Sequence, residues 1–583
     1  MKAISLRRGF ATNSSSSHSI VFSANPNDFP EGMADYGEFG WNYFVQKTQQ
    51  QKMSYIYQAF SRNFDSNEDM AEYFGVPVEM VDAVAYDGYI DHDSYGLFDM
   101  QTAKSILHND KLAILGGNDN QEDPSWVKSF QKIDRGVISV LHSRYEKFLE
   151  SGERRQVIHD YSGSIAIEKG VMTHFDKHTG VKVRYNMEDE SEVYLSVPEL
   201  VDIKITDYCP YGCSYCYQNS TEAGLHADFD KLVGMIEYMR KEGVFELAIG
   251  GGEPTLHPDF HKIIEACAGG EKDDAIVPNF TTRNLSVFRK GADKTFDLLN
   301  SIGGFAFSVD GPKDVKKFRT VVLYWIKKAH QLVERMIEDP RTYNKNCMKV
   351  RDYMKIARFL IDKVSIQLVL GGMNRDTYKK SILRFNDDLK IIYQAHDDFV
   401  CAVEKYNKEA KFYSRKIYKA EKNGDTATLE KYAEYKDIDH IFFWGWDKEE
   451  LNPTIMLLGY KTTGRGSEPE YDYTDNALDD VINVGERKFN VGERRFSIGI
   501  DTAAAQQMQE QINKRKIPSQ FYYVKEGVAS CYIDAVQDKM ASSSYCTEVE
   551  NNSMDDYSNE TFVDNFNKYQ KQGLNAIPFT YIS

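Results

Sequence analysis

Short apolar runs alternate with amphipathic helical segments from about residue 200 to residue 505, and this alternation constrains the fold more than any other feature of the chain. The first pair is VDIKIT (201–206) followed by HADFDKLVGMIEYMRKEG (226–243), whose apolar residues recur at helical spacing up to a terminal glycine. At least six such strand and helix pairs fit in this interval. Because strands separated by helices pair in parallel, we predict an α/β fold with its chemistry at the carboxyl ends of the strands.

Three cysteines follow the first of these strands. The stretch DYCPYGCSYCYQNS (207–220) holds Cys209, Cys213 and Cys216 in a loop broken by proline and glycine. Thiolates are the soft ligands that iron–sulfur clusters select, and three of them leave one iron of a four-iron cluster open to a substrate or cofactor. A zinc site completed by a distant residue is the alternative. The residues that could complete it are Cys267, Cys347, Cys401, His226 and His257.

The motifs of the predicted sheet resemble those of the radical S-adenosylmethionine (radical SAM) enzymes. The spacing CxxxCxxC, with the aromatic Tyr215 before its third cysteine, is the first signature. The second is a GGE-P motif at the end of the next strand, here residues 251–254. The third and fourth strands end in Thr-Thr-Arg-Asn (281–284) and Ser-Val-Asp-Gly (308–311), which are similar to turns of that family. The resemblance covers residues 195–370 well and residues 454–505 loosely.

This resemblance implies two cofactors, a [4Fe–4S] cluster and S-adenosylmethionine. Cys209, Cys213 and Cys216 would bind the cluster, and the amino and carboxylate groups of S-adenosylmethionine would fill its open corner. The glycines at 250–252 would admit the ligand, and Glu253 would hold its ammonium group. The full set of expected cofactor-binding residues is Tyr215, Gly251, Gly252, Glu253, Thr281, Thr282, Ser308, Asp310 and Gln367. No residue is assigned a catalytic role.

Composition excludes some functions and leaves others open. The formal net charge is −17 and the isoelectric point is about 5.4, which argues against a broad nucleic-acid footprint but not against a local basic groove. No apolar run is long enough for a transmembrane helix, and no apolar core follows the basic start as in a secretory signal. The eight cysteines are unevenly distributed, with three packed together, which suits a reducing compartment. We therefore expect a cytoplasmic protein.

The organisation expected for the chain is a partial (β/α)6 TIM-type barrel over residues 195–505, interrupted by a charged helical insertion at about 375–440. A flexible Ser-rich terminus (1–20), a mostly helical region (21–160) and a short β lead-in (161–194) precede it. Within the helical region, residues 66–85 have the spacing of a helix-turn-helix, but their carboxylates would repel the phosphates of DNA. They therefore indicate a packed helical pair rather than a DNA-binding element.

A small α+β extension (506–583) is expected after the barrel. It resembles a degraded form of the cysteine-rich extension of peptide-modifying radical SAM enzymes. Only Cys531 and Cys546 remain there, and two thiols cannot saturate a further [4Fe–4S] cluster. Two unpaired thiols are therefore the leading interpretation, and a partly ligated cluster is the alternative.

The resemblance implies that the protein takes one electron from a flavodoxin- or ferredoxin-like donor and cleaves S-adenosylmethionine to methionine and a 5′-deoxyadenosyl radical. That radical would abstract hydrogen from a substrate, for which the extension favours a peptide or protein side chain. A nucleotide- or RNA-modifying enzyme is one alternative. A non-catalytic iron–sulfur protein or scaffold is another.

Overall fold

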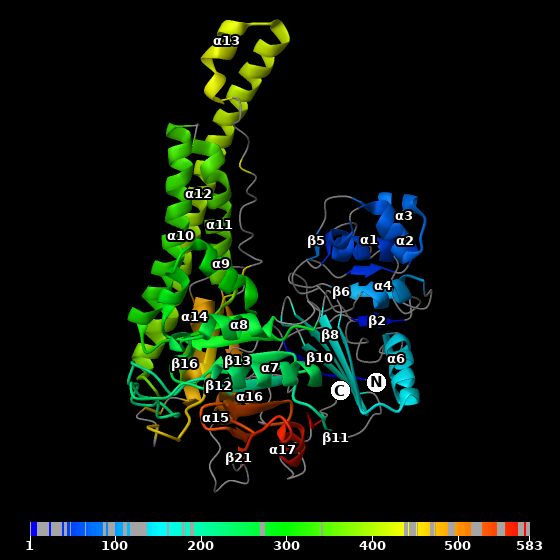
Figure 1. Ribbon diagram of the computed structural model, residues 1–583, viewed down its shortest axis with the longest axis vertical. Coiled ribbons are helices and arrows are strands. Elements are labelled where there is room, and N and C mark those ends of the chain that lie inside the picture. Colours follow the sequence, from blue (N-terminus) through cyan, green and yellow to red (C-terminus); the bar gives the residue numbers. More distant parts are fainter. Residues whose placement is uncertain are drawn as a thin grey trace.

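The computed structural model shows a sheet-based body from which a helical arm projects (Figure 1). The residues that it describes are 2–7, 22–24, 38–39, 44–46, 48–64, 66–85, 89–90, 100–108, 113–116, 137–159, 163–177, 180, 182–186, 192–268, 274–339, 342–435, 441, 451, 453–466, 471–472, 474–487, 496–514, 527–544, 554–569 and 577–578. No helix among them is both long enough and apolar enough to cross a bilayer.

A ten-stranded sheet forms the centre of the body. Seven of its strands are parallel and lie in chain order, each one joined to the next along the sheet. They are β12 (Leu200–Lys204), β13 (Glu246–Gly250), β14 (Val277–Thr282), β15 (Phe305–Ser308), β16 (Val364–Val369), β17 (Thr454–Leu458) and β18 (Ser497–Ile500). The sheet stays open at β18. The prediction of a partial barrel of parallel strands is confirmed, and one strand more than the six expected takes part.

The helix α7 (Phe229–Glu242) illustrates why the predicted pairs of a strand and a helix form. The carboxylate of Asp228 accepts a hydrogen bond from the backbone N–H of Lys231, which caps the helix start. Gly243 ends the helix in the left-handed conformation, as predicted from the sequence. Its apolar face, with Leu232 and Met239 fully buried, packs onto the sheet core. Two other helices that cover the sheet are α8 (Phe260–Cys267) and α9 (Ala292–Ser301).

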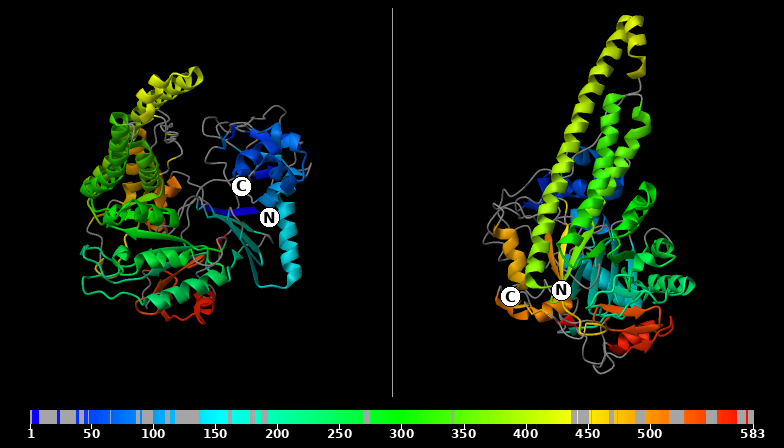
Figure 2. Two further views of the ribbon diagram at one scale, coloured as in Figure 1. Left: turned by 45° about the horizontal axis from the view of Figure 1, so that its top comes forward. Right: turned by 90° about the vertical axis from the view of Figure 1, so that its left-hand side faces the viewer.

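The arm is larger than the predicted insertion. It consists of α10 (Pro312–Glu338), α11 (Tyr343–Asp362), the 49-residue α12 (Arg375–Asn423) and the short α13 (Thr426–Lys431) (Figures 1 and 2). Both α10 and α11 lie between β15 and β16 in the chain. Helix α10 packs along α12 through buried side chains such as Trp325, Phe385 and Phe399, and α11 packs against α10. Residues 436–440 of the predicted insertion lie outside the described residues.

The region before the barrel contains a five-stranded antiparallel sheet. Its strands are β1 (Lys2–Arg7), β7 (Arg155–His159), β8 (Gly163–Glu168), β9 (Val171–Asp176) and β10 (Lys182–Asn186). Two expectations are corrected here. Residues 2–7 were expected in a flexible terminus but pair with β10, whereas residues 8–20 lie outside the described residues. The stretch SIAIEKGVMTHF was expected to be one strand but is a hairpin, because the chain turns at Lys169 and Gly170.

Helices and short strands alternate in the region 21–160. The helices are α1 (Gln49–Phe60), α2 (Asn67–Phe74), α3 (Val78–Asp82), α4 (Met100–Leu107) and α6 (Val137–Ser151), and the short strands are β2 (Phe22–Ala24), β3 (Glu38–Phe39), β4 (Phe44–Gln46), β5 (Tyr89–Ile90) and β6 (Ala113–Gly116). The expected helical pair is present as α2 and α3. Met70, Phe74 and Val81 are buried in its core, which leaves the carboxylates outside.

The C-terminal extension joins the central sheet instead of forming a separate sheet. Strand β19 (Ser530–Asp534) lies parallel to β12, and β20 (Lys539–Ala541) and β21 (Asp555–Asp556) continue the sheet in antiparallel fashion, covered by α17 (Phe562–Tyr569). Cys531 lies in β19 opposite Val201 and is 1% exposed, which raises the pKa of its thiol well above the usual range. It packs as a core side chain. Cys546 lies outside the described residues.

Candidate functional site

A cavity opens at the carboxyl ends of the parallel strands, where the sequence placed the chemistry. It encloses about 1190 Å³, including its open mouth, and its walls come from the ends of β12 to β17 and from the loop after β12. Eleven of the twelve residues predicted for the site line it. They are Cys209, Cys213, Cys216, Tyr215, Gly251, Gly252, Glu253, Thr281, Thr282, Ser308 and Gln367.

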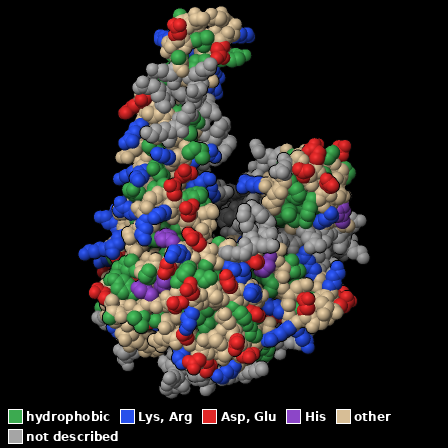
Figure 3. Space-filling model, viewed as in Figure 1, with side chains coloured by type: hydrophobic (Ala, Val, Ile, Leu, Met, Phe, Trp, Pro, Cys, Tyr) green, Lys and Arg blue, Asp and Glu red, His purple; other side chains and the backbone are tan. Residues whose placement is uncertain are grey.

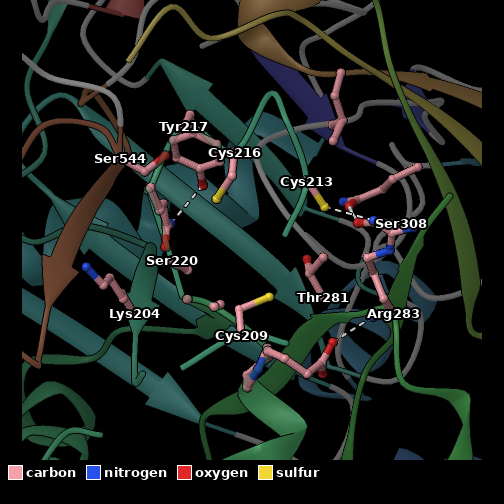
Figure 4. Close-up of a pocket in the computed structure, with 18 of the residues that line it drawn as sticks. Lys204, Cys209, Cys213, Cys216, Tyr217, Ser220, Thr281, Arg283, Ser308 and Ser544 are labelled. Atoms are coloured by element: carbon pink, nitrogen blue, oxygen red, sulfur yellow. Dashed lines mark hydrogen bonds between the residues drawn. The ribbon is translucent and has the colours of Figure 1, made fainter. Parts of the chain in front are cut away.

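The three cysteines of the loop face this cavity. All three are partly exposed and none forms a disulfide. Figure 4 shows their sulfur atoms turned toward the same space from three sides. The loop is held by backbone hydrogen bonds, among them Cys209 N–H to the carbonyl of Thr221 at 2.9 Å. Burial raises the pKa of the Cys213 thiol, while the guanidinium of Arg283 opposes this effect.

The residues proposed to complete a zinc site are elsewhere. Cys267 is buried in α8 and donates to the carbonyl of Ile263, and Cys347 and Cys401 lie on α11 and α12. His226 bonds Thr206, and His257 bonds the carbonyl of Ala227. None of the five lines the cavity within the described part of the chain, where no three Cys, His, Asp or Glu side chains converge on one ion. Thiols spaced around a larger cavity suit a multi-iron cluster better than a single zinc ion.

The carboxylate of Glu253 lines the cavity and is held by neighbouring donors. It is 1% exposed and accepts hydrogen bonds from the hydroxyls of Thr255 and Thr282, both at 2.6 Å, and from the backbone N–H of Arg283 at 2.8 Å. Burial raises the pKa of this carboxyl group, and these donors oppose the rise. Glu253 therefore joins the end of β13 to the turn after β14.

The neighbouring glycines are required by contacts within the protein. Gly251 has φ +131°, and a Cβ at this position would overlap the carbonyl oxygen of Thr206. A Cβ on Gly252 would overlap the carbonyl oxygen of Tyr208, and its N–H donates to Thr206 at 2.7 Å. These glycines therefore let β13 approach the cysteine loop. Of the three glycines, Gly250 has open space where a Cβ would lie, and all three line the cavity.

Two buried polar side chains on the wall of the cavity have an atom without a hydrogen-bond partner among the described residues. Ser308 donates to the Oε1 atom of Gln367 at 3.0 Å, and the amide nitrogen of Gln367 has no partner among the described residues although the side chain is 1% exposed. The hydroxyl of Ser220, a residue that is 2% exposed, also has no partner among the described residues. Both residues line the cavity. Because buried polar groups are normally hydrogen-bonded, these atoms indicate that a polar ligand belongs here.

Asp310 is the predicted site residue that does not line the cavity. Its carboxylate pairs with the guanidinium of Arg283 at 2.6 Å and accepts a hydrogen bond from the hydroxyl of Tyr215. Arg283 also contacts Asp314 at 3.2 Å and donates to the sulfur of Cys213 at 2.8 Å. Asp310 therefore fixes the guanidinium of Arg283, which lines the cavity and contacts Cys213.

Sequence reasoning missed the loop after β17. Arg465 donates to the carbonyl oxygens of Cys213 and Ser220, each at 3.0 Å, and its own N–H donates to the carbonyl of Cys216 at 2.9 Å. Lys461 lines the cavity with its ammonium 4.6 Å from the centre of the Tyr217 ring. The signal was present in KTTGRG (461–466), a polar glycine-containing stretch at the end of a predicted barrel strand.

We expect Gly464→Ala to lower the amount of iron that the protein binds on reconstitution. Gly464 has φ +62°, and a Cβ there would overlap the carbonyl of Tyr217 and lie 2.7 Å from that of Cys216. The left-handed conformation alone costs an alanine about 1–2 kcal/mol, and the overlap adds displacement of the cysteine loop. Gly234→Ala, in α7 with open space around it, is the matched control and should bind iron as the wild type does. Equal iron content in both variants would contradict this role of the loop.

The C-terminal extension supplies one side of the cavity. Lys204, at the end of β12, pairs with Asp534 of β19 at 2.8 Å and with Asp207 at 2.5 Å. Tyr532 and Ser544 line the cavity beyond this ion pair. The pairing of β19 with β12 therefore brings residues more than 300 positions away to the cysteines.

Three comparisons with known proteins bear on this site. Residues 203–382 match the model of the Radical SAM superfamily. The chain is 34% identical over 97 residues to a probable GTP 3′,8-cyclase of Methanococcus maripaludis and 33% identical over 73 residues to a GTP 3′,8-cyclase of Psychromonas ingrahamii. These segments cover 16% and 12% of this chain, and only 31% and 22% of the two relatives.

Solved structures with similar folds are more distant. One is SuiB of Streptococcus suis bound to the precursor peptide SuiA, with 13% identity, a TM-score of 0.35 and coverage of 64% of this chain and 66% of that one. Another is anSMEcpe with bound AdoMet and the Cp18Cys peptide, with 13% identity, a TM-score of 0.32 and coverage of 64% and 81%. Likeness at this level carries no information on the substrate.

Proposed function

Because residues 203–382 match the model of the Radical SAM superfamily, we propose that this protein is a radical SAM enzyme that modifies a peptide or protein side chain. One observation carries the chemical part of the proposal. Three cysteine thiols, spaced for a cluster with one open corner, line a cavity whose wall also holds buried polar atoms in need of a partner.

The residues present fit both cofactors. Cys209, Cys213 and Cys216 would hold a [4Fe–4S] cluster, and Gly250, Gln367 and Ser220 offer polar groups for S-adenosylmethionine. When bound, the pair supplies one-electron cleavage of the sulfonium to methionine and a 5′-deoxyadenosyl radical, which abstracts hydrogen from a substrate.

The chain itself orients these groups. Arg283 donates to Cys213 and is fixed by two aspartates, and Arg465 binds the backbone of the cysteine loop. Glu253 fixes the turn after β14. These contacts hold the thiols in place before a ligand arrives, which lowers the cost of ordering the site on binding.

The charges at the cavity favour a side chain over a nucleoside triphosphate. A triphosphate needs several available cations, but two of the three cations that line the cavity are paired with carboxylates. Arg283 is paired with Asp310 and Asp314, and Lys204 is paired with two other aspartates, while Lys461 is the third cation. Tyr217 and Tyr532 offer aromatic surface on the side formed with the C-terminal extension. Such a wall suits an uncharged side chain presented by a peptide.

The similarity to two GTP 3′,8-cyclases supports a second candidate substrate, a guanosine nucleotide. Incubation with GTP under the conditions below, followed by mass spectrometry of the nucleotide pool, distinguishes the two. Conversion of GTP would replace the peptide proposal, and unchanged GTP would exclude a guanosine nucleotide as the substrate.

We expect the reconstituted wild type to release 5′-deoxyadenosine when dithionite and S-adenosylmethionine are added without oxygen. Cys213→Ala, assayed beside it, should release none because its cluster is lost. Liquid chromatography with mass spectrometry measures the product. A wild type that carries its full cluster and still makes no 5′-deoxyadenosine would contradict the enzyme and support a non-catalytic iron–sulfur protein.

A further inference from the structure

The outer part of α12 extends past the other helices of the arm. Tyr406 stacks on Tyr343, the first residue of α11, with ring centres 5.9 Å apart. Beyond this contact α12 continues to Asn423 and is followed only by α13 and the short turn at 433–435 in the described chain. Figures 1 and 2 show this part standing away from the body, and in Figure 3 it forms the end of a column. It therefore presents a long helix face to the solvent.

Cations follow one another along this face. Six exposed cations lie here, namely Lys408, Lys411, Arg415, Lys416, Lys419 and Lys422. All but Lys416, which follows Arg415 directly, recur every three or four residues, the spacing of a single helix face. At 1.5 Å per residue the row extends over about 21 Å. The rest of the chain is strongly acidic, since without these six cations the formal net charge would be −23 rather than −17. The charge of this face is thus opposite to that of the molecule.

The row differs from an ordinary solvated helix face, where acidic and basic residues alternate. Nearer the body, α12 has such pairs, for example Lys380 with Asp376 at 2.5 Å and Arg384 with Asp388 at 2.9 Å. In the outer part, none of the six cations has an ion pair with a described residue, and Glu404 is the one carboxylate of α12 at a suitable spacing. Like charges at these spacings destabilise a helix by about 0.2–0.5 kcal/mol per pair. A partner that carries negative charge would remove this repulsion.

We infer that the outer face of α12 binds the phosphate backbone of a nucleic acid. A straight row of cations at near-regular spacing matches a line of phosphates, whereas an isolated carboxylate would need a pocket. Phe412 and Tyr418 are 51% and 65% exposed among the cations, and such rings stack with the bases of single strands. Two exposed aromatic rings are too little apolar surface for a helix that inserts into a lipid surface.

The test uses the full-length protein and a 20-nucleotide uridine RNA labelled with fluorescein. Fluorescence anisotropy at 50–200 mM salt compares the wild type with a variant in which Lys411, Arg415, Lys419 and Lys422 are changed to Gln. We expect the variant to bind more than about tenfold more weakly at 50 mM salt, and its plot of log K against log salt to be shallower by about 2.8, which is about 0.7 for each of four lost phosphate contacts. Circular dichroism should show unchanged helix content.

A matched control changes four exposed lysines outside the outer part of α12 to Gln, namely Lys241 and Lys294 of the body and Lys313 and Lys316 at the start of α10. It loses the same charge and should keep the wild-type salt slope. Equal losses in both variants would overturn the inference, as would unchanged binding in the arm variant. If the wild type binds labelled polyglutamate more tightly than RNA, the face belongs to an acidic protein partner instead. If the wild type and the control variant are dimers and the arm variant is a monomer, the face binds a second copy of this chain instead.

The inference does not depend on the radical chemistry. The arm variant should release 5′-deoxyadenosine as the wild type does, because its changes lie outside the cavity. Failure of RNA binding with intact 5′-deoxyadenosine formation would therefore reject the nucleic-acid site alone.

Discussion

Cys213→Ala is expected to reduce the iron content of the reconstituted protein from about four atoms per chain to nearly none. The cavity offers three thiols, and none of the other cysteine and histidine candidates lines it, so the described residues hold no replacement ligand. Two thiolates cannot hold a four-iron cluster. Iron analysis and visible absorption of the protein purified without oxygen measure the effect, and absorption also separates an iron–sulfur cluster from colourless zinc.

Cys401→Ala is the matched control for this prediction. Cys401 is an exposed thiol on α12, outside the cavity, and its loss should leave the iron content unchanged. The thermal unfolding of the two variants before reconstitution should be similar, since Cys213 is a partly exposed loop residue. Full iron content in Cys213→Ala would show that the three cysteines are not the ligand set.

Glu199→Ala is expected to lower the free energy of unfolding by about 3–5 kcal/mol, the cost of removing one partner from a buried ion pair. Glu199 is 1% exposed at the start of β12, where it binds Arg184 at 2.5 Å, Lys182 at 3.2 Å and the hydroxyl of Thr173 at 2.7 Å. These partners belong to β9 and β10. The carboxylate therefore joins the N-terminal sheet to the barrel. Its loss removes the ion pair with Arg184 and one of the two ion pairs of Lys182, which also contacts Glu246 at 3.4 Å. Urea denaturation followed by circular dichroism measures the difference.

The same contact predicts a pH dependence. Burial by itself would raise the pKa of Glu199, but the charges of Arg184 and Lys182, with hydrogen bonds from Arg184 and Thr173, hold it well below its usual range. A lowered pKa in the folded state stabilises the fold above the unfolded value of about 4.3, and this stabilisation declines as the pH falls from there toward the folded value. The difference between the wild type and Glu199→Ala should therefore shrink below about pH 4.

Glu237→Gln, an exposed change on α7, is the control for the acid titration and should follow the wild type throughout. A difference between the wild type and Glu199→Ala that stayed constant from pH 7 to pH 3 would show that the ion pair is not its source.

Several features of this protein were determined by the sequence itself. The helix α7 begins at Asp228 and ends at Gly243 because a capping carboxylate and a left-handed glycine act within a few residues. The alternation of strands and helices predicted the parallel sheet, because strands that are separated by helices in the chain pair in parallel. The cysteines and the GGE-P motif were predicted to meet because parallel strands place their carboxyl ends at the same edge.

Other features were decided only by the tertiary structure. The place of β19 beside β12, the contact of Arg465 with the cysteine loop, and the pairing of Asp310 with Arg283 join residues that are distant in the chain. The saturation of Glu253 by neighbouring donors is another such feature. Which partner a polar side chain meets depends on the distances and burial set by the whole fold. Local patterns of apolar and polar residues therefore predicted where the site lies, while packing between distant segments decided which partners its polar side chains have at the cavity.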